Sequence, residues 1–137
     1  MSDLAKTARA ILAADSDVTS VVSTRISCLY REEGDALPAV VIDVDSVDPD
    51  EARGLSGRAS MIRGDLTINC MAQTLSTAVD LATKCAAALA AETGTNSDGK
   101  AYAVAASIST DSVARAIDGT GAGPVSIDVD AECYLEV

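Results

Sequence analysis

The chain has 137 residues, of which 48% are hydrophobic, and 21 acidic residues against 10 basic ones give a formal net charge of -11. This length suits a single domain, residues 1–137, built around one core. The strong negative charge argues against binding nucleic acid by its phosphates and against lying on an anionic membrane.

A helix is predicted near the N-terminus, over residues 3–14, because apolar residues recur there every three or four positions. The Asp15-Ser-Asp17 group should end this helix, and residues 18–23 are expected to form a second short turn or helix. Residues 25–30 then resemble a short strand, which a charged turn at residues 31–35 follows.

Strict alternation predicts a strong strand after Pro38, a residue that suits a strand start. Apolar side chains face one way along it, and Asp43 and Asp45 face the other. The next segment, residues 48–60, contains proline, glycine and alternating charge with little to bury. We therefore expect a long mobile loop between two strands, and loops of this length inside domains are usually functional or disordered.

The middle of the chain changes its hydrophobic period abruptly. Residues 65–72 alternate with period two, which predicts a half-buried strand. Residues 76–91 repeat every three or four positions, which predicts a helix that Ser76 or Thr77 can cap. The Gly94–Gly99 stretch should end this helix, so that it folds back over the strand.

Two further strands are predicted toward the C-terminus. Residues 102–108 alternate, and residues 115–123, rich in glycine, form a second flexible connection. The final strand, residues 125–137, alternates most regularly, with Asp128, Asp130 and Glu132 on its polar side.

The element order is therefore α-β-β-β-α-β-β. It predicts an α+β fold: a mostly antiparallel sheet of about five strands with two helices packed on one face. The four cysteines are far apart, fall on apolar faces and form no CxxC pair. We interpret them as small buried hydrophobes in a reducing compartment, with a disulfide pair as the alternative. No transmembrane run and no signal peptide is visible.

The assembled pattern resembles the tail terminator, or tail completion, proteins of long-tailed bacteriophages, the family that includes the lambda minor tail protein U. The resemblance rests on the helix at residues 4–14, the Val21–Ile26 segment, the Ala36–Ile42 segment, the long polar loop, and the strand-helix unit from Leu66 to Leu89.

The resemblance implies a structural virion protein. Family members form a ring, usually a hexamer, at the head-proximal end of the tail tube, where the ring stops tube polymerisation and joins the head connector. DNA passes through the ring without specific binding. The implied partners are copies of the chain, the tail tube protein and the head connector, and the implied location is the virion, assembled in the host cytoplasm.

The acidic strand faces are the first candidate site, and they comprise Asp43, Asp45, Asp128, Asp130 and Glu132. If adjacent strands join these carboxylates, they could hold Ca²⁺ or Mg²⁺, line a lumen that repels DNA phosphates, form a subunit contact, or simply be a solvated sheet face. We expect no metal site.

A basic group is the second candidate: Arg53, Arg58 and Arg63 cluster in the glycine-rich loop and its exit. It suggests a docking arm for an acidic surface on a neighbour, with a solubilising loop as the simpler interpretation and DNA binding as a further alternative. The glycines at 119, 121 and 123 lack the helix and the Lys-Ser/Thr pair of a phosphate-binding loop.

Catalysis has little support in this sequence. The absence of histidine removes Ser-His and Cys-His nucleophile systems, and a sugar-stacking cleft is hard to build without Trp or Phe. We expect no enzyme, no catalytic residue and no cofactor. Two other classes stay open: another head-tail joining or head completion protein, and an acidic cellular α+β binding module.

Overall fold

The structure is a computed structural model that describes residues 3–28, 36–49, 61–118 and 124–136. Its elements follow one another as α1 (Asp3–Ala14), α2 (Ser16–Val22), β1 (Ile26–Cys28), β2 (Ala39–Pro49), β3 (Met61–Ala72), α3 (Leu75–Leu89), β4 (Glu92–Thr95), β5 (Ala101–Ile108), α4 (Thr110–Asp118) and β6 (Val125–Glu136).

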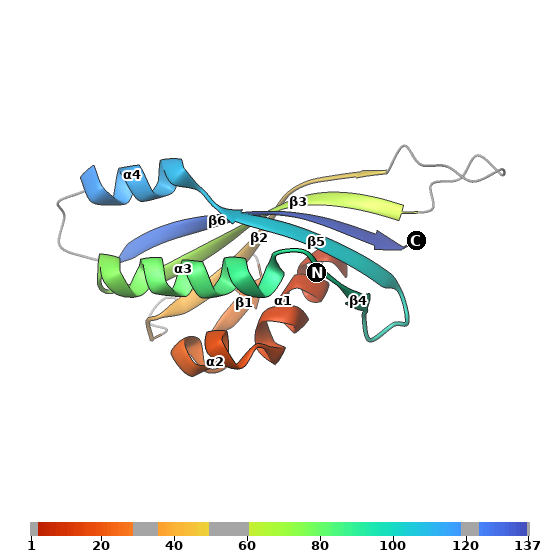
Figure 1. The fold of residues 1–137 in the computed structure, drawn as a ribbon, viewed down its shortest axis with the longest axis horizontal. Helices are drawn as coiled ribbons and strands as arrows, with labels where there is room; N and C mark the ends of the chain where they lie inside the picture. The colour runs from red at the N-terminus through yellow and green to blue at the C-terminus, as the bar shows by residue number, and fades with distance from the viewer. Residues whose placement is uncertain (1–2, 29–35, 50–60, 119–123, 137) are drawn as a thin grey trace.

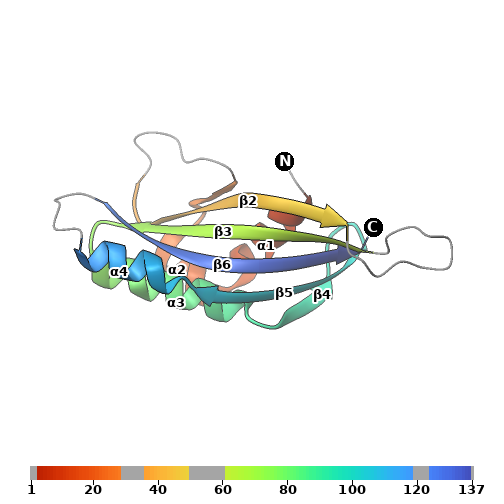
Figure 2. The ribbon, with the colours of Figure 1, turned by 90° about the horizontal axis from the view of Figure 1, so that it is seen from above.

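The strands form a six-stranded sheet in the order β1-β2-β3-β6-β5-β4, and Figure 2 shows its long strands side by side. All neighbouring pairs are antiparallel except β1 and β2, which run parallel. The three longest strands, β2, β3 and β6, lie next to one another. The sheet is therefore mixed and has one strand more than the sequence predicts.

Helices α1, α2 and α3 cover one face of this sheet (Figure 1). Among the described residues, no helix covers the other face of β2 and β3, whereas α4 packs beside the start of β6 and contacts Asp128 through Arg115 and Ser112. The core lies between these two layers. Its largest fully buried side chains come from both layers: Leu4, Leu12, Val18, Val22, Val40, Ile42, Leu66, Ile68, Leu81, Leu89, Ile127 and Leu135. The expected α+β arrangement, with helices packed against one apolar sheet face, is confirmed.

Four helices are found in the described residues, where two are predicted and residues 18–23 are expected to form a turn or helix. The first difference arises at Asp15, whose Oδ1 atom accepts hydrogen bonds from the backbone N–H of Asp17 (2.9 Å) and of Val18 (3.1 Å). Asp15 is thus the N-cap of α2, so the polar group that separates the two helices also starts the second one.

The second difference is α4, which occupies Thr110–Asp118, where a flexible connection is predicted from residue 115 onward. Ser109 starts this helix: its Oγ accepts from the N–H of Ser112 (3.3 Å), and its carbonyl accepts from the N–H of Val113 (3.3 Å). The predicted flexible connection was wrong over residues 115–118. The helix there is short and has only a few apolar residues, so no clear hydrophobic period reveals it in the sequence. Residues 119–123 of that connection lie outside the described residues.

Helix α3 begins and ends earlier than predicted. Thr74 is its N-cap, with Oγ1 accepting from the N–H of Thr77 at 3.2 Å, in place of Ser76 or Thr77 itself. The helix ends at Leu89, and Gly94 lies in the edge strand β4. The Gly94–Gly99 stretch therefore builds a hairpin between β4 and β5 instead of stopping the helix.

Close packing of α1 on the sheet depends on Gly64 in β3. A Cβ atom at this position would collide with Cδ1 of the fully buried Leu4. A glycine therefore lets the start of α1 approach the strand directly. The loop predicted over residues 48–60 is shorter at its start, because β2 continues to Pro49; residues 50–60 lie outside the described part of the chain.

The four cysteines are free thiols, as the sequence predicts: Cys70, Cys85 and Cys133 are buried, and Cys28 is half-buried. Burial raises the pKa of the Cys133 thiol to about 11, which keeps it protonated at neutral pH. Among the described helices, none has the length and apolar character needed to cross a membrane.

Candidate functional site on the open face of the sheet

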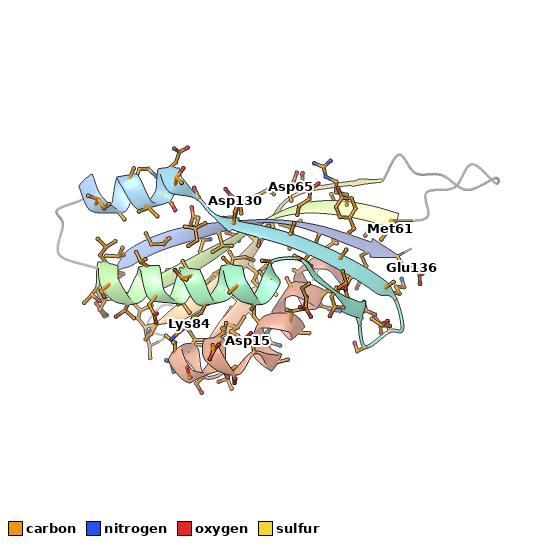
Figure 3. All side chains as sticks on the ribbon, in the orientation of Figure 1. Asp15, Met61, Asp65, Lys84, Asp130 and Glu136 are labelled. Atoms are coloured by element: carbon orange, nitrogen blue, oxygen red, sulfur yellow. The ribbon has the colours of Figure 1, made fainter. Side chains whose placement is uncertain are left out.

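The predicted acidic residues all lie on the open face of the sheet, on β2 and β6. Strand β3 separates them: Asp43 stands opposite Thr67, and Thr67 stands opposite Asp130. Figure 3 shows Asp130 and Asp65 on the side of the sheet away from α1–α3. The two predicted acidic faces are thus one surface, hereafter the acidic face, with β3 along its middle.

Polar side chains of β3 hold the carboxylates of β2. The amide Nδ2 of Asn69 donates to Oδ2 of Asp43 at 2.8 Å, and the hydroxyl of Thr67 donates to Oδ2 of Asp45. A β-bulge between Val44 and Ser46 makes Asp45 an extra residue in its strand and sets it on the surface. The carboxylates are therefore oriented by neutral donors, and their negative charge is not neutralised by these contacts.

Arg63 is tied into the acidic face by ion pairs. Its Nε lies 2.8 Å from Oε1 of Glu132, and its Nη2 lies 3.7 Å from Oδ1 of Asp65. The hydroxyl of Tyr134 also donates to Oε1 of Glu132, at 2.8 Å. Because the Arg63 side chain is 45% exposed, each pair contributes only about 0–1 kcal/mol to the stability of the fold.

Asp128 is half-buried, with a side chain that is 24% exposed. Burial raises the pKa of its carboxyl; Arg115, with Nη2 at 3.8 Å from Oδ2, lowers it, and the nearby carboxylates of Asp130, Asp43 and Asp45 raise it. The raised pKa shows that the fold disfavours the charged form of this side chain. Burial is the larger cause of the raised pKa, and repulsion from carboxylates on the same face of the sheet adds to it.

The Asp130 side chain is exposed, and it has no hydrogen-bond or ion-pair partner among the described residues. No group of three or more Cys, Asp or Glu residues within the described ranges is arranged to hold a metal ion. The strands space the carboxylates apart with threonine and asparagine between them. Such a surface is suited to projecting a negative field, which repels phosphate groups.

Three residues of this surface are not among the predicted site residues: Asp65, Thr67 and Asn69. The signal was present, because the period-two alternation of residues 65–72 places all three on the polar side of the strand. Of the predicted basic group, the structure places Arg63 on the acidic face and does not describe Arg53 and Arg58. The glycines at 119, 121 and 123 also lie outside the described residues.

The family model of tail completion protein gp17 matches residues 7–116, which is most of the chain. No curated protein matches the sequence. Among solved structures, a chain from the virion of a native gene transfer agent particle superposes with a TM-score of 0.59 at 16% sequence identity; the match covers 98% of this chain and 95% of that chain. At that identity the likeness concerns the fold.

Proposed function

Because this chain belongs to the tail completion protein gp17 family of phage structural proteins, we propose that it forms a ring at the head-proximal end of a tail. Membership of the family assigns it a structural role in the tail. The ring would end growth of the tail tube and offer its outer side to the head connector. The virion would be its location, reached after assembly in the host cytoplasm.

A ring requires that each copy bind the next through two different surfaces, because a head-to-tail contact that closes on itself gives a cycle. We propose about six copies per ring, as the resemblance to tail terminators implies. The gene transfer agent chain with the same fold comes from a virion, which supports a place for this chain in a tailed, phage-like particle.

The acidic face is the observation that carries the proposal. It is a polar sheet surface left open by α1–α3, and its carboxylates outnumber Arg63 and Arg115, the cations that contact them. Facing the channel of a ring, it would repel the phosphates of passing DNA at every point. DNA would then slide through without adhering, which a passage at the head-tail junction requires.

The basic group supplies a second part of the proposal. Arg63 contacts Glu132 and Asp65 of its own chain, so the docking role falls mainly to Arg53 and Arg58. We propose that these two bind an acidic surface on a neighbouring copy or on the tail tube protein. Salt would weaken such a contact, because it screens exposed charges.

The test is the shape of tails made without this chain. A tail terminator predicts tubes of uncontrolled length with no heads attached, seen by electron microscopy. Normal-length tails that fail only to join heads would overturn the terminator role and identify a head completion protein instead. Complementation with the native chain should restore both length control and head joining.

A further inference from the structure

A pocket on the helix side of the molecule is separate from the acidic face. It lies between α1, α2 and the turn that leads from α2 into β1, with a volume of about 290 Å³. Its polar lining differs from the rest of this acidic chain, because it combines one arginine with several hydroxyls: Arg9, Thr19, Ser23 and Thr24.

Arg9 is held in a fixed position at this pocket. Its Nε donates to the carbonyl oxygen of Ile26 at 2.9 Å, which ties the guanidinium to the start of β1. The two terminal amino groups of Arg9 have no partner among the described residues. A guanidinium with both terminal groups available is suited to bind a carboxylate with two parallel hydrogen bonds.

The hydroxyls beside Arg9 are also available as donors. Thr19 donates to the carbonyl oxygen of Asp15 at 3.1 Å, but the side chains of Ser23 and Thr24 have no partner in the part of the chain that the structure describes. Both of these residues are exposed. The pocket therefore offers a cation and two neutral donors to one anionic group.

The backbone at Ser23 gives independent support. Ser23 has φ 55° and ψ -118°, and the N–H of Arg25 donates to the carbonyl of Val22 at 2.9 Å. These values describe a tight turn in which Ser23 occupies the position that glycine favours. A residue other than glycine that keeps its backbone in such a sparsely populated conformation points to a function for its side chain.

We propose that this pocket binds an aspartate or glutamate side chain of a second copy of the chain, and so forms one half of the contact between neighbours in the ring. The chain has 21 acidic residues, so a neighbouring copy presents carboxylates over most of its surface. The pocket and the carboxylate are different surfaces, as a head-to-tail contact requires. The inference rests on the proposed ring.

The occupant can be identified by crosslinking. The R9K variant places an amine in the pocket, and a carbodiimide joins an amine directly to a carboxylate that it contacts. Tails would be assembled from a mixture of isotope-labelled and unlabelled copies and then purified, so that a crosslink between two copies can be told from one within a copy. Peptide mapping should find the introduced amine joined to an Asp or Glu peptide of another copy. A crosslink to a different tail protein, or none at all, overturns the inference.

The contribution of the pocket is measured by exchange of labelled subunits between purified rings. R9Q should raise the exchange rate about tenfold, since a charge-assisted hydrogen bond is lost. S23G should raise it about threefold while keeping or raising the melting temperature, because glycine relieves the turn and only the hydroxyl is lost. S23G thus separates binding from folding.

Lys6 provides the matched control, since it lies on the same helix, outside this pocket, and K6Q makes the same change of charge. K6Q should leave the exchange rate unchanged. Native exchange rates in both R9Q and S23G overturn the pocket while the ring stands. Electron micrographs that show no ring at the tail end would instead overturn the proposed function.

Discussion

The two faces of the central sheet are built from the same strands and differ in almost every other respect. In β3, Leu66 and Ile68 point toward the helices and are fully buried. The alternating residues Asp65 and Thr67 point to the open side of the sheet. The covered face is held by apolar packing. The open face is held by hydrogen bonds and ion pairs between partly exposed side chains.

This difference separates the residues that stabilise the fold from those to which we assign the proposed role. Apolar burial supplies most of the favourable free energy of folding. A strand that buries one face is therefore stable without burying the other. The other face is free to carry charges that the fold does not need. The burial of Asp128 and its repulsion by neighbouring carboxylates are a cost to stability, which the proposed role of the acidic face in the ring would account for.

The strongest test of the difference between the two faces compares the variants Ile68→Ala and Thr67→Ala, because these two residues are neighbours in the chain on opposite faces of the sheet. Ile68→Ala leaves a cavity in the core and should lower the free energy of unfolding by about 2–5 kcal/mol. Thr67→Ala removes one hydrogen bond to Asp45 and should lower it by about 0.5–1.5 kcal/mol. Urea unfolding measures both, and equal losses would contradict the account.

Gly64→Ala tests how tightly the covered face is packed. The added methyl group would collide with Leu4, so α1 must shift, and we expect a loss of about 1–3 kcal/mol. The double variant with Leu4→Ala is the control: it removes the collision, so the two changes together should cost less than the sum of each alone. Strict additivity would show that the two side chains do not meet.

Arg63→Gln removes the cation that contacts Glu132 and Asp65 on the open face. We expect a loss of about 0–1 kcal/mol, because these pairs are partly exposed. Added salt should shrink the difference between variant and native protein in thermal melts, since it screens the lost attraction. A loss as large as that for Ile68→Ala would show that the ion pairs of Arg63 stabilise the fold as much as core packing does.

Asp128→Asn should have the smallest effect, and a favourable one. The pKa of Asp128 is raised above its ordinary value of 3.8, so the folded state binds the proton more tightly than the unfolded state. Its contribution to stability is therefore greatest at acid pH and is lost as the pH rises through the raised pKa.

Substitution by the neutral amide should accordingly stabilise the protein at neutral pH by about 0.5 kcal/mol. The gain should disappear in melts below the ordinary pKa of an aspartate, where the native side chain is also uncharged. A variant that is less stable than the native protein at neutral pH would show that the contact with Arg115 outweighs the burial of Asp128 and its repulsion by neighbouring carboxylates.

The sequence predicts the parts of the fold that a hydrophobic period controls. The strict alternation in β3 and β6 and the repeat in α3 identify these elements to within a few residues. Short elements were predicted less well: α2, with seven residues, was expected only as a turn or helix, and β4, with four, and α4, with nine, were not predicted. Caps and tertiary contacts decide such elements, and a window of that size holds too few apolar residues to show a period.

The candidate site was predicted in part for the same reason. Alternation shows that Asp43 and Asp130 point away from the apolar side of their own strands, but only the strand order places β3 between them. Register is set by pairing across the sheet, which no single segment reveals. The pocket at Arg9 could not be predicted, since it depends on a turn that holds Ser23 at positive φ.

Cryo-electron microscopy of the head-proximal tail end would show whether the acidic face lines the channel of a ring. We expect a closed ring of this chain in which the acidic face, with Asp43, Asp65 and Asp130, lines the channel and α1–α3 face away from it. A ring with the acidic face turned outward, or buried between neighbouring copies, would contradict the account.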